Sequence, residues 1–392
     1  MRIAYVCADL GVPVFGQKGC SIHAQEIMRA FRGYGAELKL FTVNPGGKPM
    51  PDLDMVSMHP VTIPLKGTPG EREVAAIRAN ADFREALERE EPYDFVYERY
   101  SLWSYSGMEY ARAAEIPGLL EVNAPLIEEQ AKHRVLVNRD VAEQVATRIF
   151  GTATALLAVS REVAAYLEGY EAARGKIHVI PNGVNPGRFT DDVKPSLPAQ
   201  PGVFTVGFVG TLKPWHGLTA LVEAFAILNA RYPEVRLLVV GDGTERENLL
   251  KELSLHGLLE VAHLTGAVPP DEMPGLLASM DVAVCPYPQQ DFYFSPLKVY
   301  EYMAAGLPVV VSRIGQLDEL IENEVTGLVI PPDDVMSLVE ALSRLLLDYN
   351  LRIRLGQAAR RAILRDHTWS NIAQCILGIA GIELVKQSPL TR

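Results

Sequence analysis

The chain has 392 residues, a net charge of −11 and 48% hydrophobic side chains. At about 100–200 residues per domain, this length predicts two domains, with three as the alternative. The negative charge argues against a nucleic-acid-binding protein, because neutralising phosphates requires a basic surface. The four cysteines stand far apart in the sequence, which favours buried free thiols over disulfides or a metal site. They are Cys7, Cys20, Cys285 and Cys375.

No apolar segment approaches the roughly 20 residues that a membrane-spanning helix needs. The N-terminal apolar run is interrupted by Asp9, which argues against a secretory signal. We therefore expect a cytoplasmic protein. Peripheral attachment to the inner face of a membrane and the oligomeric state stay open.

Short apolar segments alternate with longer helical ones along the first half of the chain. The predicted strands cover 2–8, 37–43, 94–97, 119–122, 155–159 and 177–180, and the predicted helices cover 21–31 and 126–150. A polar, proline-rich stretch at 186–202 then has the composition of a linker. The alternation restarts with strands at 203–209, 235–240, 261–264, 282–285 and 309–312 and helices at 218–228, 244–255 and 370–385.

Apolar strands separated by helices predict parallel sheets that are covered on both faces. The fold class is therefore α/β, with two doubly wound, Rossmann-like parallel-sheet domains facing each other across a cleft. We expect an N-terminal domain at 1–185, a linker at 186–202 and a C-terminal domain at 203–369. The helix in 370–392 is expected to pack across the domain boundary. Ligands of such sheets bind beyond the carboxyl ends of the strands, so the loops that follow strands are the candidate sites.

The segment around Lys298 has the pattern of a well-defined helix of about ten residues. Ser295 is a suitable N-cap and Pro296 fits the first helical position. The free N–H groups and the positive end of the helix suit a phosphate. Lys298 and Glu301 share a face, where the lysine can neutralise a diphosphate and the carboxylate can accept ribose hydroxyls. A surface helix with a solvated Lys–Glu pair explains the same pattern.

Two loops of the second half follow predicted strands. The first, 207–217, holds Lys213, Trp215 and His216 together, which favours anion binding over an ordinary turn. The second contains Gly241, Asp242 and Gly243 and permits a tight turn against a nucleotide. A plain helix start explains this second loop equally well.

The first half carries candidates at the ends of its predicted strands. His23 lies in the first turn of the helix that follows the glycine-bearing loop 11–19, and a lone histidine is more often structural than functional. Asn123 and Arg99 end strands, and Glu129 lies on the helix that follows Asn123. Each of these side chains could contact an acceptor, a neighbouring side chain or solvent. The Asp-x-Asp of residues 52–54 lies among prolines and is interpreted as a loop rather than a metal site.

Together these segments resemble the family-4 retaining glycosyltransferases, which have the GT-B fold. The resemblance covers nearly the whole chain. It rests on the glycine loop with His23, on 181–184, on 208–210 with the loop after it, on 241–243, and above all on 301–309. It implies an acceptor-binding first domain, a second domain that binds a nucleotide-sugar, and metal-independent transfer with retained anomeric configuration.

The chain departs from the family pattern at three places. The first of the family's two glutamates falls on Tyr293, whereas Glu301 matches the second, which holds the ribose. The phosphate-binding Arg and Lys of the family fall on Thr211 and His216, and Lys213 and Lys298 are plausible substitutes. The family's usual histidine after an acceptor-domain strand falls on Asn123.

We therefore expect transfer of a sugar, a hexose in the first instance, from a nucleotide-sugar to a carbohydrate, lipid-linked or small-molecule hydroxyl acceptor. No cofactor, metal ion or nucleic-acid partner is expected. The predicted catalytic residues are Lys298, His216, Lys213, Asn123 and His23. The predicted donor-binding residues are Gly19, Gly210, Thr211, Gly241, Asp242, Gly243, Tyr293, Ser295, Pro296, Leu297 and Glu301. The predicted acceptor-binding residues are Arg99 and Glu129.

Two alternatives remain at this stage. One is a nucleotide-sugar epimerase of related two-domain fold, and the other is a non-catalytic nucleotide-sugar-binding protein. A dehydrogenase is disfavoured, because the first loop lacks the G-x-G-x-x-G dinucleotide fingerprint.

Overall fold

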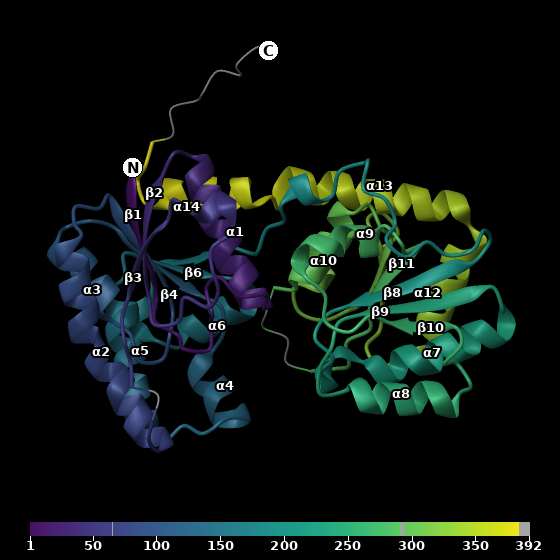
Figure 1. The fold of residues 1–392 in the computed structure, drawn as a ribbon, viewed down its shortest axis with the longest axis horizontal. Helices are drawn as coiled ribbons and strands as arrows, with labels where there is room; N and C mark the ends of the chain where they lie inside the picture. Colours follow the sequence, from purple (N-terminus) through teal and green to yellow (C-terminus); the bar gives the residue numbers. More distant parts are fainter. Residues whose placement is uncertain (65, 291–292, 294, 384–392) are drawn as a thin grey trace, which may run out of the picture. The chain divides into compact units, whose positions relative to one another are not determined.

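The structure is a computed structural model that describes residues 1–64, 66–290, 293 and 295–383 (Figure 1). The chain divides into two compact units. The first contains the described residues of 1–182 and 369–383, together with Tyr293 and Ser295. The second contains 183–290 and 296–368.

Within the described residues, the first unit is built on a sheet of seven parallel strands in the order β3-β2-β1-β4-β5-β6-β7. The inner strands are almost continuously apolar because helices cover both faces of the sheet. The strands are β1 (Arg2–Cys7), β2 (Glu37–Thr42), β3 (Ser57–Pro60), β4 (Phe95–Arg99), β5 (Gly118–Val122), β6 (Ala155–Ala158) and β7 (Ile177–Val179).

The helices of this unit are α1 (Gly19–Gly33), α2 (Pro69–Arg89), α3 (Ser106–Ala113), α4 (Leu126–His133), α5 (Arg139–Thr152), α6 (Arg161–Glu168) and α14 (Trp369–Ile379). Side chains of α2, α3, α5 and α6 share one apolar core with the strands. Helix α14, although last in the chain, packs beside α1 (Figure 1). Of the helix predicted at 370–385, residues 384 and 385 lie outside the described part of the chain.

The single helix predicted at 126–150 is wrong, because the chain forms two helices there. Helix α4 ends at His133, and the backbone of the next residue, Arg134, is extended. The buried Glu73 carboxylate then accepts the backbone N–H groups of Val137 and Asn138, both at 2.9 Å. This contact satisfies backbone donors just before α5, where helical bonds are missing, and so stabilises the break.

The second unit contains, among the described residues, a sheet of six parallel strands in the order β10-β9-β8-β11-β12-β13. They are β8 (Phe204–Val209), β9 (Val235–Val240), β10 (Ala262–Leu264), β11 (Val282–Cys285), β12 (Val309–Ser312) and β13 (Leu328–Ile330). The helices are α7 (Leu218–Arg231), α8 (Arg246–Leu255), α9 (Met273–Leu277), α10 (Leu297–Ala304), α11 (Leu317–Leu320), α12 (Val335–Leu347) and α13 (Tyr349–Asp366). Helices α7 and α12 pack together, and α10 packs on α13.

Both strand orders reverse direction at one point, between β1 and β4 in the first unit and between β8 and β11 in the second. Ligands of doubly wound sheets bind beyond the carboxyl ends of the strands at such a switch point. The two parallel α/β units confirm the predicted fold class. Ligand-binding side chains are expected in the loops after β1, β4, β8 and β11.

One predicted helix start is wrong. Helix α10 begins at Leu297, with Pro296 at the N-cap position and no side-chain cap. Ser295 does not cap it, because the Ser295 hydroxyl and carbonyl oxygens accept hydrogen bonds from the backbone and side-chain amides of Asn182, at 3.3 and 2.9 Å. The helix therefore has eight residues.

Candidate functional site

The ammonium group of Lys298 is enclosed inside the second unit. Its Nζ lies 4.4 Å from the ring centre of Phe208 and 5.3 Å from that of Tyr287. Among the described residues it has neither solvent exposure nor a hydrogen-bond partner. Burial disfavours the charged form and lowers the pKa of Lys298 to about 8. A buried ammonium without a protein partner is costly, which is typical of a group that receives an anionic ligand.

The loop after β8 approaches this ammonium through its backbone. A Cβ at Gly210 would lie 2.9 Å from Lys298 Nζ, and the backbone there has φ +143°, so a glycine fits where other residues would be strained. Gly241, with φ +133°, packs so closely that a Cβ would lie 2.1 Å from the Gly210 carbonyl oxygen. Leu212 N–H also donates to the Asp242 carbonyl at 2.9 Å. The loops after β8 and β9 thus form one surface.

His216 lies in the same cluster and is 7% exposed. Its ring centre is 5.8 Å from that of Phe208 and 5.6 Å from that of Tyr287. Burial, and then the charge of Lys298, lower the pKa of His216 to about 3. The imidazole is therefore neutral near pH 7 and offers a hydrogen bond rather than a positive charge. Lys213 has a different environment, with its Nζ 5.8 Å from the ring centre of the partly exposed Trp215.

Glu301, on α10, forms an ion pair with Arg188. Arg188 Nη1 donates to Glu301 Oε1 at 2.6 Å, and Nη2 donates to the carbonyl oxygen of Pro270, also at 2.6 Å. Both side chains of the pair are 21% exposed. The guanidinium thus fixes the carboxylate while leaving part of it open to solvent.

The first unit has its own polar cluster, centred on the Glu121 carboxylate of β5. Oε1 accepts from the Tyr97 hydroxyl at 2.7 Å and contacts His23 Nε2 at very short range. Oε2 accepts from Asn123 Nδ2 at 2.9 Å and from Arg99 Nη1 at 3.2 Å. Burial alone would raise the pKa of Glu121, but His23, Arg99 and the Tyr97 hydroxyl lower it to about 2. The carboxylate is therefore ionised at neutral pH.

His23 is held on all sides by protein groups. Its Nδ1 lies 2.7 Å from Asn182 Oδ1, its Nε2 contacts Glu121, and its ring meets the edge of Trp369 at 5.0 Å between centres. It is 5% exposed. Of the predicted first-unit residues, the structure thus brings His23, Asn123 and Arg99 together through Glu121, with His23 as the enclosed member.

A cavity of about 650 Å³ lies beyond the carboxyl ends of β1 and β4, at the switch point of the first sheet. Arg99, Asn123 and the other predicted acceptor residue, Glu129, all line it. Tyr293 lines it too, with its hydroxyl 3.0 Å from Glu129 Oε2 and its carbonyl oxygen bonded by the Ser160 hydroxyl at 2.6 Å. Tyr293, predicted to bind donor, therefore contacts a predicted acceptor residue.

The remaining predicted residues are placed by backbone position. Gly19 is the first residue of α1, and Leu297 is the first of α10. Thr211 follows Gly210 in the loop after β8 and is exposed, and Gly243 follows Asp242 in the loop after β9. Sequence reasoning missed Glu121, Arg188 and Tyr287. A lone charge inside the apolar run of β5 was a usable signal for Glu121, whereas Arg188 lies in the proline-rich stretch assigned to a linker.

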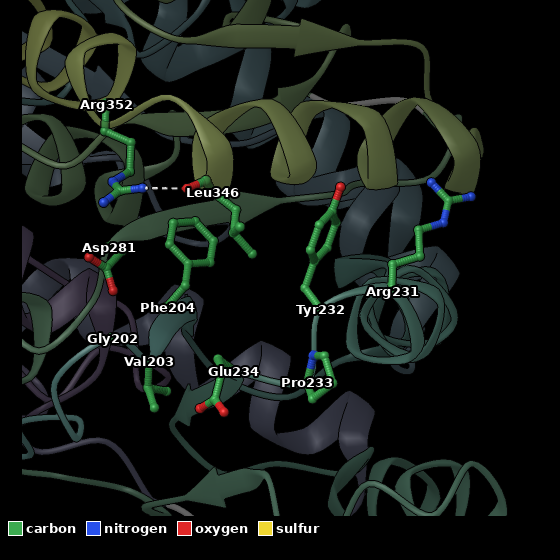
Figure 2. Close-up of a pocket in the computed structure, with 10 residues that line it drawn as sticks. All are labelled: Gly202, Val203, Phe204, Arg231, Tyr232, Pro233, Glu234, Asp281, Leu346 and Arg352. Carbon is green, nitrogen blue, oxygen red and sulfur yellow. Dashed lines mark hydrogen bonds between the residues drawn. The ribbon is translucent and has the colours of Figure 1, made fainter.

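A second cavity, of about 410 Å³, is shown in Figure 2. Gly202 and Val203 precede β8, Glu234 precedes β9, and Asp281 precedes β11, so this cavity lies at the amino-terminal edge of the sheet. Arg352 there donates to the carbonyl oxygen of Leu346 at 3.0 Å (Figure 2). Because α/β sheets bind ligands at the opposite edge, this cavity is not a candidate for the donor site.

In the part of the chain that the structure describes, no group of three or more His, Cys, Asp or Glu side chains is arranged to hold a metal ion. The Asp52 carboxylate of the Asp-x-Asp segment instead accepts a charged hydrogen bond from Arg29. No helix among the described residues has the length and apolar character needed to cross a bilayer.

Comparison with known proteins covers both units. Residues 18–183 match a family model described as a glycosyl transferase 4-like domain, and residues 203–348 match one described as glycosyl transferases group 1. The chain is 28% identical over 317 residues to a D-inositol 3-phosphate glycosyltransferase of Corynebacterium urealyticum, across 76% of this chain and 72% of the relative.

Solved structures show the same fold. A sucrose-phosphate synthase from Thermosynechococcus elongatus superposes with a TM-score of 0.73 at 22% identity, over 96% of this chain and 98% of that one. The Anabaena protein HepE, in complex with UDP-glucose, superposes with a TM-score of 0.71 at 19% identity, over 97% and 99% of the two chains.

Proposed function

The chain belongs to the family-4-type glycosyltransferases of GT-B fold, and we propose that it transfers a sugar from a nucleoside-diphosphate-sugar to a hydroxyl acceptor. The proposal includes retention of the anomeric configuration, a hexose as the transferred sugar and no requirement for a metal ion. The acceptor is a carbohydrate, a lipid-linked sugar or another small hydroxylated molecule. The family matches favour transfer over an epimerase or a non-catalytic binding protein.

The strongest support for a donor site in the second unit is the buried Lys298 ammonium. It has no partner among the described residues and lies against the glycine loop that follows β8. A diphosphate would supply the missing negative charge, and the glycines of the loop carry no side chain to keep the backbone N–H groups from such a ligand. The solved structure of HepE holds UDP-glucose, which supports a ligand of this class.

Glu301 is proposed to accept hydrogen bonds from the ribose hydroxyls of the donor. The Arg188 guanidinium orients the carboxylate, and the partial exposure of both side chains leaves the carboxylate open to a ligand. Lys298 and Glu301 thus divide the binding of the nucleotide between its phosphates and its sugar.

The mechanism that we propose is mainly electrostatic. As the bond between the anomeric carbon and the diphosphate oxygen breaks, negative charge develops on the leaving diphosphate, and the Lys298 ammonium stabilises it. The neutral His216 ring donates or orients a hydrogen bond in the same cluster. The acceptor hydroxyl oxygen bonds to the anomeric carbon on the face that the diphosphate leaves. Its proton passes to the departing phosphate, so no protein general base is assigned.

The experiment that tests this function begins with a thermal-shift screen of nucleotides and nucleotide-sugars, because a ligand that binds only the folded state raises the melting temperature. The best donor is then incubated with and without acceptors in the presence of EDTA, and NMR reports the anomeric configuration of the product. Nucleotide release with a retained anomeric centre is expected. An isomerised donor without nucleotide release would contradict transfer, and donor binding without turnover would contradict catalysis. Loss of activity in EDTA would contradict the absence of a metal requirement.

A further inference from the structure

A basic and apolar segment, 132–139, runs over the surface of the first unit from the end of α4 to the start of α5. We propose that this segment binds the surface of a lipid bilayer that contains anionic lipids, with Val135 and Val137 entering the headgroup region. Such binding goes beyond the proposed glycosyl transfer and does not depend on it, because it involves neither a donor nor an acceptor.

Three exposed valines lie in the segment or beside it. Val135 and Val137 are 58% and 55% exposed, and Val74 of α2 is 40% exposed. Val74 and Val137 line the same surface hollow. The Val137 side chain also reaches the first turn of α2, where a Cβ at Gly70 would lie 3.4 Å from Val137 Cγ1. Single apolar side chains are normal on a protein surface, whereas a group of them marks an interaction site.

The backbone of the segment is fixed by hydrogen bonds, although its side chains are exposed. The buried Glu73 carboxylate accepts the N–H groups of Val137 and Asn138, both at 2.9 Å, and the side-chain amide of Asn138 at 2.7 Å. The Gln130 amide donates to the Val135 carbonyl oxygen at 2.9 Å. A rearrangement that hid the valines would break these bonds, so the valines stay in water unless a partner covers them.

The segment is cationic within an acidic chain. Residues 130–139 contain no Asp or Glu and include Lys132, Arg134 and Arg139, whereas the whole chain has a net charge of −11. Arg139 pairs with Glu128 at 2.8 Å, and the exposed Lys132 and Arg134 have no ion pair among the described residues.

The surroundings of the segment do not cancel its charge. The adjoining hollow is lined by basic and acidic side chains in equal number, namely Lys66, Arg78, Glu71 and Asp82. The field of a charged surface is screened within about 10 Å at 0.1 M salt, so the acidic groups farther away contribute little at contact. Anionic lipids attract Lys and Arg side chains that come this close to the bilayer.

The order of residues along the segment favours a bilayer over other anionic surfaces. The two exposed valines stand between cations, with Lys132 and Arg134 before them and Arg139 after them. At a bilayer, apolar side chains enter the interface while the cationic groups stay with the lipid phosphates. A nucleic acid offers phosphates without an apolar layer. Because Arg134 also lines the 650 Å³ cavity, a chain bound in this way would keep that cavity next to the lipid headgroups.

Flotation of the full chain with vesicles tests this binding. Vesicles of phosphatidylcholine alone are compared with vesicles in which about one third of the lipid is phosphatidylglycerol or phosphatidylserine, at about 0.1 M and about 0.5 M salt. We expect at least tenfold tighter binding to either anionic vesicle at the lower salt, since each exposed cation contributes about fivefold. Most of this preference should disappear at the higher salt. Equal affinity for the two anionic lipids distinguishes attraction to a charged surface from recognition of one headgroup.

Variants of the valines locate the contact. Val135→Ser combined with Val137→Ser should weaken binding to anionic vesicles about tenfold, because less apolar surface leaves water. Val325→Ser, at a valine of the second unit that is 41% exposed, is the matched control. Val135→Trp should bind more tightly than the wild type, and its fluorescence should shift to shorter wavelength on addition of anionic vesicles, since tryptophan prefers the bilayer interface. A gain of binding cannot result from loss of the fold.

Variants of the cations test the electrostatic part. Lys132→Gln combined with Arg134→Gln should remove most of the preference for anionic over neutral vesicles, whereas Lys251→Gln, at an exposed position of α8, should keep it. Equal binding to neutral and anionic vesicles, no binding to either, a requirement for one particular headgroup, or unchanged binding in both double variants would overturn the proposed bilayer contact. Vesicle binding is measured without a donor, so its failure would leave the proposed glycosyl transfer standing. Failed transfer with intact vesicle binding would contradict the transfer alone.

Discussion

The guanidinium of Arg188 holds the carboxylate of Glu301 at 2.6 Å, although the two residues are 113 positions apart in the chain. Its second hydrogen bond, to the Pro270 carbonyl oxygen, ties the pair to the segment before α9. Arg188 therefore fixes the orientation of a carboxylate on α10 without itself belonging to the helix. If Glu301 binds the ribose, Arg188 is a positioning residue for donor binding.

Replacing Arg188 with alanine should raise the KM for the donor about tenfold and change kcat less. Without Arg188, the Glu301 carboxylate is no longer oriented, and its charged hydrogen bonds to the bound donor are lost. Arg188→Lys should restore part of the affinity, since the charge remains but the two-pronged geometry is lost. Initial rates at varied donor concentration measure both constants. Arg313→Ala, which removes an exposed ion pair with Asp318, is the control. An unchanged donor KM in Arg188→Ala would argue against this role.

Replacing Lys298 with methionine should stabilise the fold while impairing the reaction. Below pH 8 the wild-type chain buries an unpartnered ammonium, and methionine of similar size removes that cost. The pKa of Lys298, about 8 in the fold against about 10.4 unfolded, corresponds to on the order of 3 kcal/mol. Urea unfolding at pH 7 measures the gain. Turnover should fall at least a hundredfold, because the charge acts on the leaving diphosphate.

The Lys298→Met variant also tests how the stability of the protein depends on pH. Between pH 8 and about 10.4 the folded wild type releases the Lys298 proton before the unfolded chain does, so its stability rises with pH in that window. The methionine variant should lack this rise. For the wild type, kcat/KM for the donor should decline above pH 8, as the free enzyme loses the ammonium. A decline of equal size in the variant would show that another group is responsible.

Much of the fold followed from local pattern, because buried parallel strands are short apolar runs between helices. Two strands escaped that pattern. Ser57–Pro60 is a polar edge strand, and Leu328–Ile330 has only three residues. The helix predicted at 126–150 failed because the break depends on Glu73, a residue of another helix. Local sequence cannot show a contact of that kind.

Local sequence likewise predicted some residues of the candidate sites and could not predict others. Gly210 and His216 were predicted from a loop that follows a strand and Lys298 from the start of a helix, and the structure places the three residues in one cluster. The pairing of Arg188 with Glu301 could not be predicted, because it joins distant segments. Glu121 could have been suspected as a single charge within the apolar run Gly118–Val122, but its four partners come from β4, α1 and the end of its own strand.

Replacing Glu121 with glutamine should lower the free energy of unfolding at pH 7 by about 3–5 kcal/mol, since the change leaves the buried Arg99 without its counter-charge. The pKa of Glu121 is near 2 in the fold and near 4.3 unfolded, so its contribution is complete above pH 4.3 and is lost as the pH falls toward 2. The wild type should therefore lose more stability than the variant between pH 5 and pH 3. Glu128→Gln, which breaks an exposed pair with Arg139, should change stability by less than about 1 kcal/mol.

Glu98 on β4 is a buried carboxyl group whose titration should be visible in the stability of the protein. It is fully buried, its Oε1 accepts the Ser104 hydroxyl at 2.5 Å, and burial raises its pKa to about 7. Between about pH 4.3 and pH 7 the folded chain keeps a proton on Glu98 that the unfolded chain has released. The free energy of unfolding therefore falls as the pH rises through this window.

Glu98→Gln should therefore make the protein more stable than the wild type above pH 7.5, by about 3 kcal/mol, and should bring little change at pH 4.5, where Glu98 is protonated in the fold. Urea unfolding at pH 4.5, 6 and 8 measures the difference in stability between the variant and the wild type at each pH. Glu37→Gln, at an exposed position in the same sheet, controls for the loss of a carboxylate as such. A difference between Glu98→Gln and the wild type that is the same at all three pH values would mean that packing, and not ionisation, determines the effect of this residue.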